Sequence, residues 1–341
     1  YPTITDHVYG AAPGNIPTYM FPNNRDGVDD VANIDEGSSS FPDNLIMRAN
    51  AEGTNWWDEV FDPAPMQDHT LAISGGTDAG TYRISANYQD QQGTMINTYF
   101  KRYAIRANSQ WNLGKVTIGE NLNISRVESV GVPGGSQQEG GTIVQIIKAQ
   151  PIIPVYDISG VNFAGGKSNG LSNGDNPVAR LERGKDNVGE FDAIIGSMFA
   201  EVELIEGLKA KTSFGLNYSV GGQVNLNFPT FENSEPNTVN SFNENLNRSF
   251  NWVWTNTLNY NRTFNERHNL NLLVGYESLK ERFRQINGSI GQFFLTGVDS
   301  RYLNSTIANP ETRQVNSGGS EHTLLSTFAK VDYGLDNKYL F

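Results

Sequence analysis

Apolar and polar residues alternate with a period of two along most of the chain. Between residues 81 and 89, the apolar positions are Tyr82, Ile84, Ala86 and Tyr88. The polar positions between them are Thr81, Arg83, Ser85 and Asn87. Such alternation is typical of a β-strand with one face in an apolar medium and the other in water. The pattern therefore predicts strands that separate two environments.

The segment 102–113 repeats this alternation. Its apolar face carries Tyr103, Ile105, Ala107, Trp111 and Leu113, interrupted only by Ser109. Its polar face carries Arg102, Arg106, Asn108, Gln110 and Asn112. Aromatic residues stand at both ends of the apolar face, as they do in the aromatic girdles of outer-membrane strands.

About nine strands are expected from the alternation of apolar and polar residues. They cover residues 71–74, 81–89, 102–113, 116–124, 194–204, 208–218, 250–264, 268–276 and 325–333. Tight turns are expected at residues 75–80, 114, 206–207 and 265–267, and long polar loops at 128–190, 220–248 and 280–322. Short periplasmic turns and long extracellular loops are the pattern of an outer-membrane barrel. Because short and long connections alternate along the chain, we expect residues 1–66 to form an extracellular loop region and residues 67–341 the barrel part.

Glu120 disagrees with the alternation, because it falls on the apolar face between Ile118 and Leu122. A charge there costs up to about 2–4 kcal/mol near the bilayer midplane, and less for Glu than for Lys or Arg. We expect a β-bulge beside Gly119 that turns Glu120 to the polar face.

Composition limits the classes of protein to which the chain can belong. Only 37% of the 341 residues are hydrophobic, and no run approaches the roughly 20 apolar residues of a membrane-spanning helix. The absence of cysteine excludes disulfides, thiolate metal sites and cysteine nucleophiles. The net charge of -12, with acids and bases interspersed, argues against nucleic acid as a partner. Together these features favour an all-β, partial transmembrane antiparallel β-barrel.

Several long stretches resemble one family. They are TNWWDEVFDPAPMQDHTLAISGG (54–76), YRISANYQDQQGTMINTYFKRYAIRANSQWNLGKVTIGENLNIS (82–125), IPVYD (153–157), GLKAKTSFGLNY (207–218), HNLNLLVGYE (268–277) and STFAKVDYGLDNKYLF (326–341). In this order they resemble the SusC/RagA family of TonB-dependent transporters of Bacteroidota. The resemblance implies a 22-stranded plugged barrel. Signal peptide, TonB box and plug domain are missing from the sequence, so we expect a barrel fragment.

The resemblance also implies a function. Members import glycans, or less often peptides, across the cell outer membrane, with a SusD-like surface lipoprotein as lid and TonB as the energy source. The expected partners are therefore that lipoprotein, TonB, the cargo, and the lipid and lipopolysaccharide of the outer membrane. No enzymatic activity and no cofactor are implied. A soluble all-β carbohydrate-binding or hydrolytic domain and a passive porin remain alternatives.

The sequence gives little support for a catalytic site or a metal-binding site. The acidic residues Asp26, Asp29, Asp30, Asp35 and Glu36 could hold calcium or supply a glycosidase pair, but their spacing fits no EF-hand, and a solvated acidic loop is favoured. His7, His69, His268 and His322 are scattered, without metal-ligand spacing. We expect no catalytic residue and no metal site.

The candidate substrate-binding residues are three arginines and two tryptophans. Arg83, Arg102 and Arg106 point into the lumen by alternation, where they face the plug, the ligand or water. Trp56 and Trp57 lie in a loop and either contact ligand or anchor that loop. Trp252 and Trp254 are expected in the aromatic girdle near the extracellular rim.

Overall fold

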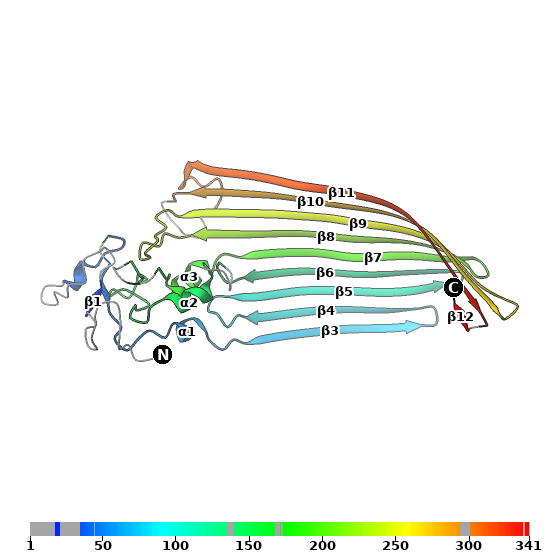
Figure 1. The fold of residues 1–341 in the computed structure, drawn as a ribbon, viewed down its shortest axis with the longest axis horizontal. Coiled ribbons are helices and arrows are strands. Elements are labelled where there is room, and N and C mark those ends of the chain that lie inside the picture. Colours follow the sequence, from blue (N-terminus) through cyan, green and yellow to red (C-terminus); the bar gives the residue numbers. More distant parts are fainter. Residues whose placement is uncertain are drawn as a thin grey trace.

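Long antiparallel strands, each paired with its neighbours in sequence, make up most of the protein (Figure 1). The computed structural model describes residues 18–20, 35–43, 45–134, 140–167, 171, 173–293, 301–336 and 338–340. Within these residues the main sheet has ten strands, in the order β12-β11-β10-β9-β8-β7-β6-β5-β4-β3. This up-and-down order is that of an opened barrel wall.

The elements are bounded as follows. The long strands are β3 (Met66–Thr77), β4 (Gly80–Gln92), β5 (Tyr99–Leu113), β6 (Val116–Val130), β7 (Gly189–Ile205), β8 (Leu208–Asn227), β9 (Ser241–Phe264), β10 (His268–Gly291) and β11 (Asn309–Leu335). The short elements are β1 (Tyr19–Met20), β2 (Met47–Arg48), β12 (Tyr339–Leu340), the 3-10 helix η1 (Glu36–Ser38), and the helices α1 (Trp56–Val60), α2 (Thr142–Lys148) and α3 (Pro177–Gly184). All nine predicted strands and the predicted tight turns are present.

The predicted loops were too long, because the strands continue past the apolar band. β8 runs to Asn227, β9 begins at Ser241, and β10 and β11 extend to Gly291 and from Asn309. Here polar residues dominate, and apolar residues such as Leu226, Phe242 and Ile290 are buried in a small core, so the regular hydrophobic alternation stops although the backbone ladder continues. An antiparallel ladder satisfies its backbone hydrogen bonds without any apolar face.

The strand register confirms the predicted faces. Ile84 stands opposite Ala107, and Ala86 opposite Ile105, while Ser85 stands opposite Arg106. Directly opposed residues point to the same side of a sheet. We call the side that carries Ile84 and Ile105 the outer face, and the side that carries Ser85 and Arg106 the inner face.

No element of the described chain covers the apolar part of the outer face. Leu71, Ile84, Ile105, Met198, Val274 and Val331 are each more than half exposed. A soluble protein rarely leaves so large an apolar surface open to water. The outer face therefore has the character of a lipid-facing barrel surface, with the inner face turned to the lumen.

The predicted bulge at Glu120 is wrong. The register of β6 against β5 runs without a break, and Glu120 stays on the outer face opposite Ser109. The Ser109 hydroxyl donates to the Glu120 carboxylate, and the Trp111 indole donates to the Ser109 oxygen at 3.0 Å. Glu120 is also only four residues from Val116, the first residue after the turn, so it lies near the interface rather than the midplane.

Gly119 has a packing role instead. A Cβ built there would lie 2.5 Å from the ring of Phe199, which fills the inner face beside it. The glycine thus makes room for an aromatic side chain on the neighbouring strand.

The helices and the long connections gather at one end of the sheet, opposite most of the tight turns (Figure 1). We call this part, residues 45–62, 93–98, 131–134, 140–167, 171, 173–188 and 228–240, the loop cap. It has a hydrophobic core that includes Trp56, Val60, Met95, Ile146 and Leu181. No helix among the described residues combines the length and hydrophobicity needed to cross a bilayer.

The facing of β4 can be tested in the complete protein. Ile84→Lys should lower the free energy of unfolding by a few kcal/mol, because the charge enters lipid, whereas Ser85→Lys should cost less than about 1 kcal/mol. Chemical unfolding in lipid vesicles measures both. Single cysteines from Tyr82 to Gln89 should react with a water-soluble thiol reagent at the odd positions only. Equal labelling of both faces would contradict the assignment.

Candidate functional site

A polar pocket of about 460 Å³ lies in the loop cap between α3 and the loop that joins β8 to β9. Its charged and amide side chains include Asp175, Arg180, Arg183, Glu232, Asn233 and Asn237. Donors and acceptors thus converge on one cavity, as they do in small-molecule sites.

Helix α3 positions the two arginines. Asn176 caps its N-terminus, with the side-chain oxygen accepting from Ala179 N at 3.0 Å and the side-chain nitrogen donating to the Val155 and Ala164 carbonyls at 2.8 and 2.9 Å. Pro177 follows at the first helical position, where its missing N–H costs nothing. The buried face of α3 includes Leu181, and Arg180 and Arg183 reach the pocket.

The more deeply buried of two ion pairs in the pocket joins Arg183 and Glu232. Arg183 Nη1 lies 2.6 Å from Glu232 Oε1, and the Glu232 side chain is fully buried. The guanidinium of Arg183 also lies 5.3 Å from the ring centre of Phe163. Gly165 permits the close approach of the loop, since a Cβ there would lie 2.5 Å from the Glu232 carbonyl oxygen.

Three polar atoms around the pocket lack a hydrogen-bond partner within the described residues. They are Glu232 Oε2, Asn233 Oδ1 and Arg180 Nε, all buried. The remaining Arg180 nitrogens are engaged, with Nη1 on Asp175 Oδ2 at 2.7 Å and Nη2 on the Gly140 carbonyl at 2.5 Å. Buried polar atoms are rarely left unpaired. The pocket wall therefore carries two acceptors and one donor whose hydrogen-bonding capacity is not used within the described residues.

The three predicted arginines lie on the barrel wall and not in this pocket. Arg102 Nη2 donates to Asn87 Oδ1 at 3.2 Å, Arg106 Nε donates to Asn123 Oδ1 at 3.1 Å, and Arg83 is exposed. The inner face of β4, β5 and β6 carries these arginines and no acidic residue. This part of the wall is thus positively charged and rich in amides.

The two predicted tryptophans differ in exposure. Trp56 is fully buried in the cap core, and its indole nitrogen donates to the Gln150 carbonyl at 3.2 Å. Trp57 is 47% exposed, and its ring lies 4.6 Å from that of Phe61. Trp56 therefore anchors the loop, and only Trp57 has a free surface for a ligand.

The acidic loop gives no metal site among the described residues, in which no group of three or more potential ligands could hold an ion. Glu36 accepts from Tyr19 and Arg48, each at 2.5 Å, and Asp35 caps η1. Asp26, Asp29 and Asp30 lie outside the described residues.

Glu182 on α3 is held by neighbouring donors. Burial raises its pKa, but hydrogen bonds from Asn97 at 2.8 Å and Lys185 at 3.1 Å outweigh burial, so the pKa lies below its usual value. Asn97 belongs to the connection between β4 and β5. The carboxylate thus ties α3 to the barrel hairpin.

Sequence reasoning missed the pocket residues. Asn176-Pro177 is a helix-start signature that could have located α3 and its arginines. Glu232 has no comparable signal, because it lies 49 residues from its partner Arg183 in a segment without periodicity.

Comparisons with known proteins agree with the fold. No family model matches the chain. TonB-dependent receptor P3 of Formosa agariphila is 29% identical over 84% of this chain, and TonB-dependent receptor SusC of Bacteroides thetaiotaomicron is 24% identical over 88%. The chain covers only 28% and 30% of these relatives. A solved structure of the RagAB peptide transporter superposes with a TM-score of 0.69 at 21% identity, covering 91% of this chain and 34% of that one.

The fold is that of part of the barrel of a TonB-dependent transporter. Within this class the chain is similar to the SusC/RagA type, so the resemblance stated from the sequence is confirmed. Its division into residues 1–66 and 67–341 stays a prediction.

The ion pair of the pocket can be tested by substitution. Arg183→Gln should lower cap stability by about 3 kcal/mol, because it leaves the Glu232 carboxylate buried without its partner. Adding Glu232→Gln should restore part of this loss. The control Lys185→Gln removes an exposed cation at the C-cap of the same helix and should cost less than about 0.5 kcal/mol. Hydrogen exchange of the cap measures these effects, and equal losses for Arg183→Gln and Lys185→Gln would contradict the assignment.

A pH dependence follows from Glu182. Because its pKa is lowered in the folded protein, its stabilising contribution is present above the ordinary carboxyl pKa of about 4.3 and is lost as the pH falls through the lowered value. Hydrogen exchange of α3, corrected for intrinsic rates, should increase over this acidic range. Glu182→Gln should flatten the profile; an unchanged profile would argue against this link.

Proposed function

We propose that the protein containing this chain imports glycans or peptides across the outer membrane, energised by TonB and assisted by a SusD-like surface lipoprotein. The observation that carries this proposal is the uncovered apolar outer face on strands of the SusC/RagA type. A soluble carbohydrate-binding or hydrolytic domain would have to bury that face. The protein is not proposed to be an enzyme, because its relatives are receptors and transporters.

The polar pocket is the proposed contact for cargo in this segment. Cargo hydroxyls or amides would donate to the unpaired oxygens of Glu232 and Asn233 and accept from Arg180. Both glycans and peptides carry such groups, and RagAB is described as a peptide transporter. Trp57 supplies an exposed aromatic surface in the same cap.

The inner wall serves a second proposed role. Arg83, Arg102 and Arg106 would face the plug or passing cargo, since the inner face of their own strands carries no acidic residue. Trp56 contributes indirectly by holding α1 in the cap core. Lipid and lipopolysaccharide would surround the outer face.

Energy coupling separates the importer from a passive porin. Cells carrying the complete protein should accumulate labelled cargo, and deletion of TonB should abolish accumulation. Uptake that survives the deletion would favour the porin. The protein should also require detergent for extraction and migrate anomalously unless boiled; a soluble, cooperatively folding monomer would contradict the barrel.

The pocket can be tested in the same uptake assay. Arg180→Gln should raise the cargo concentration for half-maximal import about tenfold, as expected for the loss of one charge-assisted hydrogen bond. Lys185→Gln, at the C-cap of the same helix but outside the pocket, is the matched control. Unchanged import by Arg180→Gln in a stably folded protein would remove the pocket from the cargo path.

A further inference from the structure

Cations gather on the outer face where β9 and β10 leave the apolar band. They are Arg248, Lys280, Arg282 and Arg284, which we call the basic cluster. Lys280 is opposite Trp252, and Arg282 is opposite Phe250. Each cation therefore lies level with, or just beyond, the aromatic girdle, on the same face as the lipid-facing side chains.

Two arginines of the cluster face each other directly. Arg248 on β9 is the register partner of Arg284 on β10. Like charges directly opposite on adjacent strands destabilise a sheet. Both side chains are exposed, and neither has an acidic partner among the described residues. The pair therefore concentrates positive charge that the described protein leaves uncompensated.

The neighbouring acidic residue already forms ion pairs with other cations of the cluster. Glu321 on β11 lies 2.8 Å from Lys280 and 3.9 Å from Arg282. Its charge is thus shared by two members of the cluster and leaves Arg248 and Arg284 without a counter-ion. On the other side of Arg284, the register partner is Gly319, which has no side chain. A hollow of about 390 Å³ adjoins Arg282, Arg284 and Gly319.

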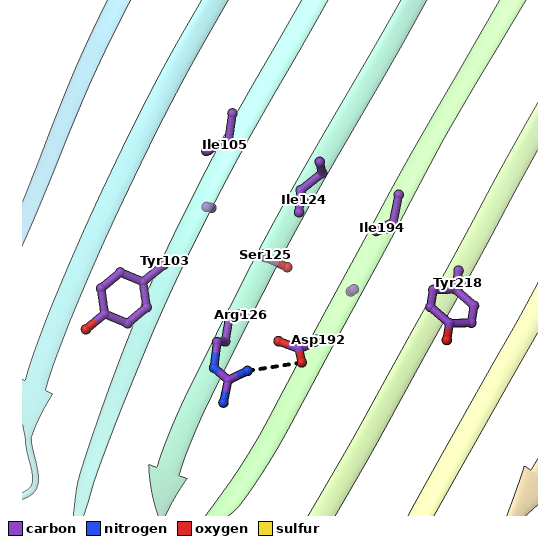
Figure 2. A pocket seen from close by; sticks show the side chains of 10 residues that line it. Tyr103, Ile105, Ile124, Ser125, Arg126, Asp192, Ile194 and Tyr218 are labelled. Carbon is purple, nitrogen blue, oxygen red and sulfur yellow. Dashed lines mark hydrogen bonds and ion pairs between the residues drawn. The ribbon is translucent and has the colours of Figure 1, made fainter.

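Another outer-face cation provides a contrast (Figure 2). On β6, Arg126 borders a hollow of about 290 Å³ lined by Tyr103, Ile105, Ile124, Ile194 and Tyr218. Here the guanidinium is neutralised by Asp192 at 3.3 Å and Glu190 at 2.7 Å. Thus, where this cation stands at the limit of the band, the protein supplies the anion itself.

We infer that the basic cluster binds a phosphate group of an anionic glycolipid of the outer leaflet, with Arg248 and Arg284 gripping the phosphate. This rests on the proposed outer-membrane placement of the sheet. Guanidinium groups bind phosphate through two parallel N–H donors, and two arginines on adjacent strands can grip it from both sides. The girdle residues Phe250 and Trp252 would contact the acyl chains and the headgroup boundary of the same lipid.

The test uses the complete transporter, purified in detergent and stripped of lipid. Binding of phosphorylated lipid A is measured by native mass spectrometry for the wild type and the double variant Arg248→Gln/Arg284→Gln. The variant should bind about 30-fold more weakly, since each cation near an anionic lipid surface contributes roughly a fivefold factor. Arg262→Gln is the matched control, because Arg262 lies on the outer face of the same strand at the opposite end. Equal binding by the double variant and the wild type would overturn the inference.

Two further arms identify the ligand. Chemically dephosphorylated lipid A should bind wild type and double variant alike; a persisting difference would overturn the phosphate assignment. Inorganic phosphate at the same concentration should not compete with lipid A, and full competition would make the free ion the ligand. Loss of self-association by the variant with unchanged lipid binding would make the surface a protein interface. Heat-modifiable migration of every variant shows that the barrel is intact, so a failed barrel is distinguishable from a failed lipid site.

Discussion

The antiparallel register is the constraint on which every facing relation in this protein depends. It is interrupted only between Glu203 and Ile205, beside a turn, and between Ser289 and Gly291, at the loop end, among the pairings of the described strands. Because side chains alternate strictly, a slip of one residue would place the arginines of β5 in lipid and its isoleucine in water. The unbroken ladder through the apolar band therefore defines the lipid surface and the lumen wall together.

The sheet and the loop cap are stabilised by different means. The cap has a core of its own, with Trp56 and Leu181 buried among aliphatic side chains. The band of the sheet has no such cover, so its apolar residues need a lipid environment. The polar pocket belongs to the cap, where a buried carboxylate is acceptable because Arg183 meets it at 2.6 Å. The proposed cargo contact thus lies on a part of the protein that can pack in water.

Sequence reasoning recovered the features that repeat and missed those that do not. The nine strands and their faces follow from the period of two, which reports directly on the medium at each face. The strand ends beyond Phe250 and Tyr276 were missed because polar residues interrupt the regular alternation there, and the apolar residues Phe242 and Ile290 are buried in a small core with loop residues. Glu120 was misplaced because the sequence does not reveal that Ser109 stands opposite and that Phe199 occupies the space beside Gly119. The Arg183–Glu232 pair joins distant segments that share no pattern.

The length of the β9–β10 hairpin has a mechanical consequence. Its two strands are paired at 24 positions, from His268 opposite Phe264 to Gly291 opposite Ser241. Inter-strand hydrogen bonds lie perpendicular to the strands, so a force along the strands loads many of them at once and not one after another. Such a shear-loaded ladder is stiff. A pulling force exerted through the lumen would therefore displace the segment that the barrel wall encloses. The wall would keep its shape, and the distance of the loop cap from the apolar band would stay constant.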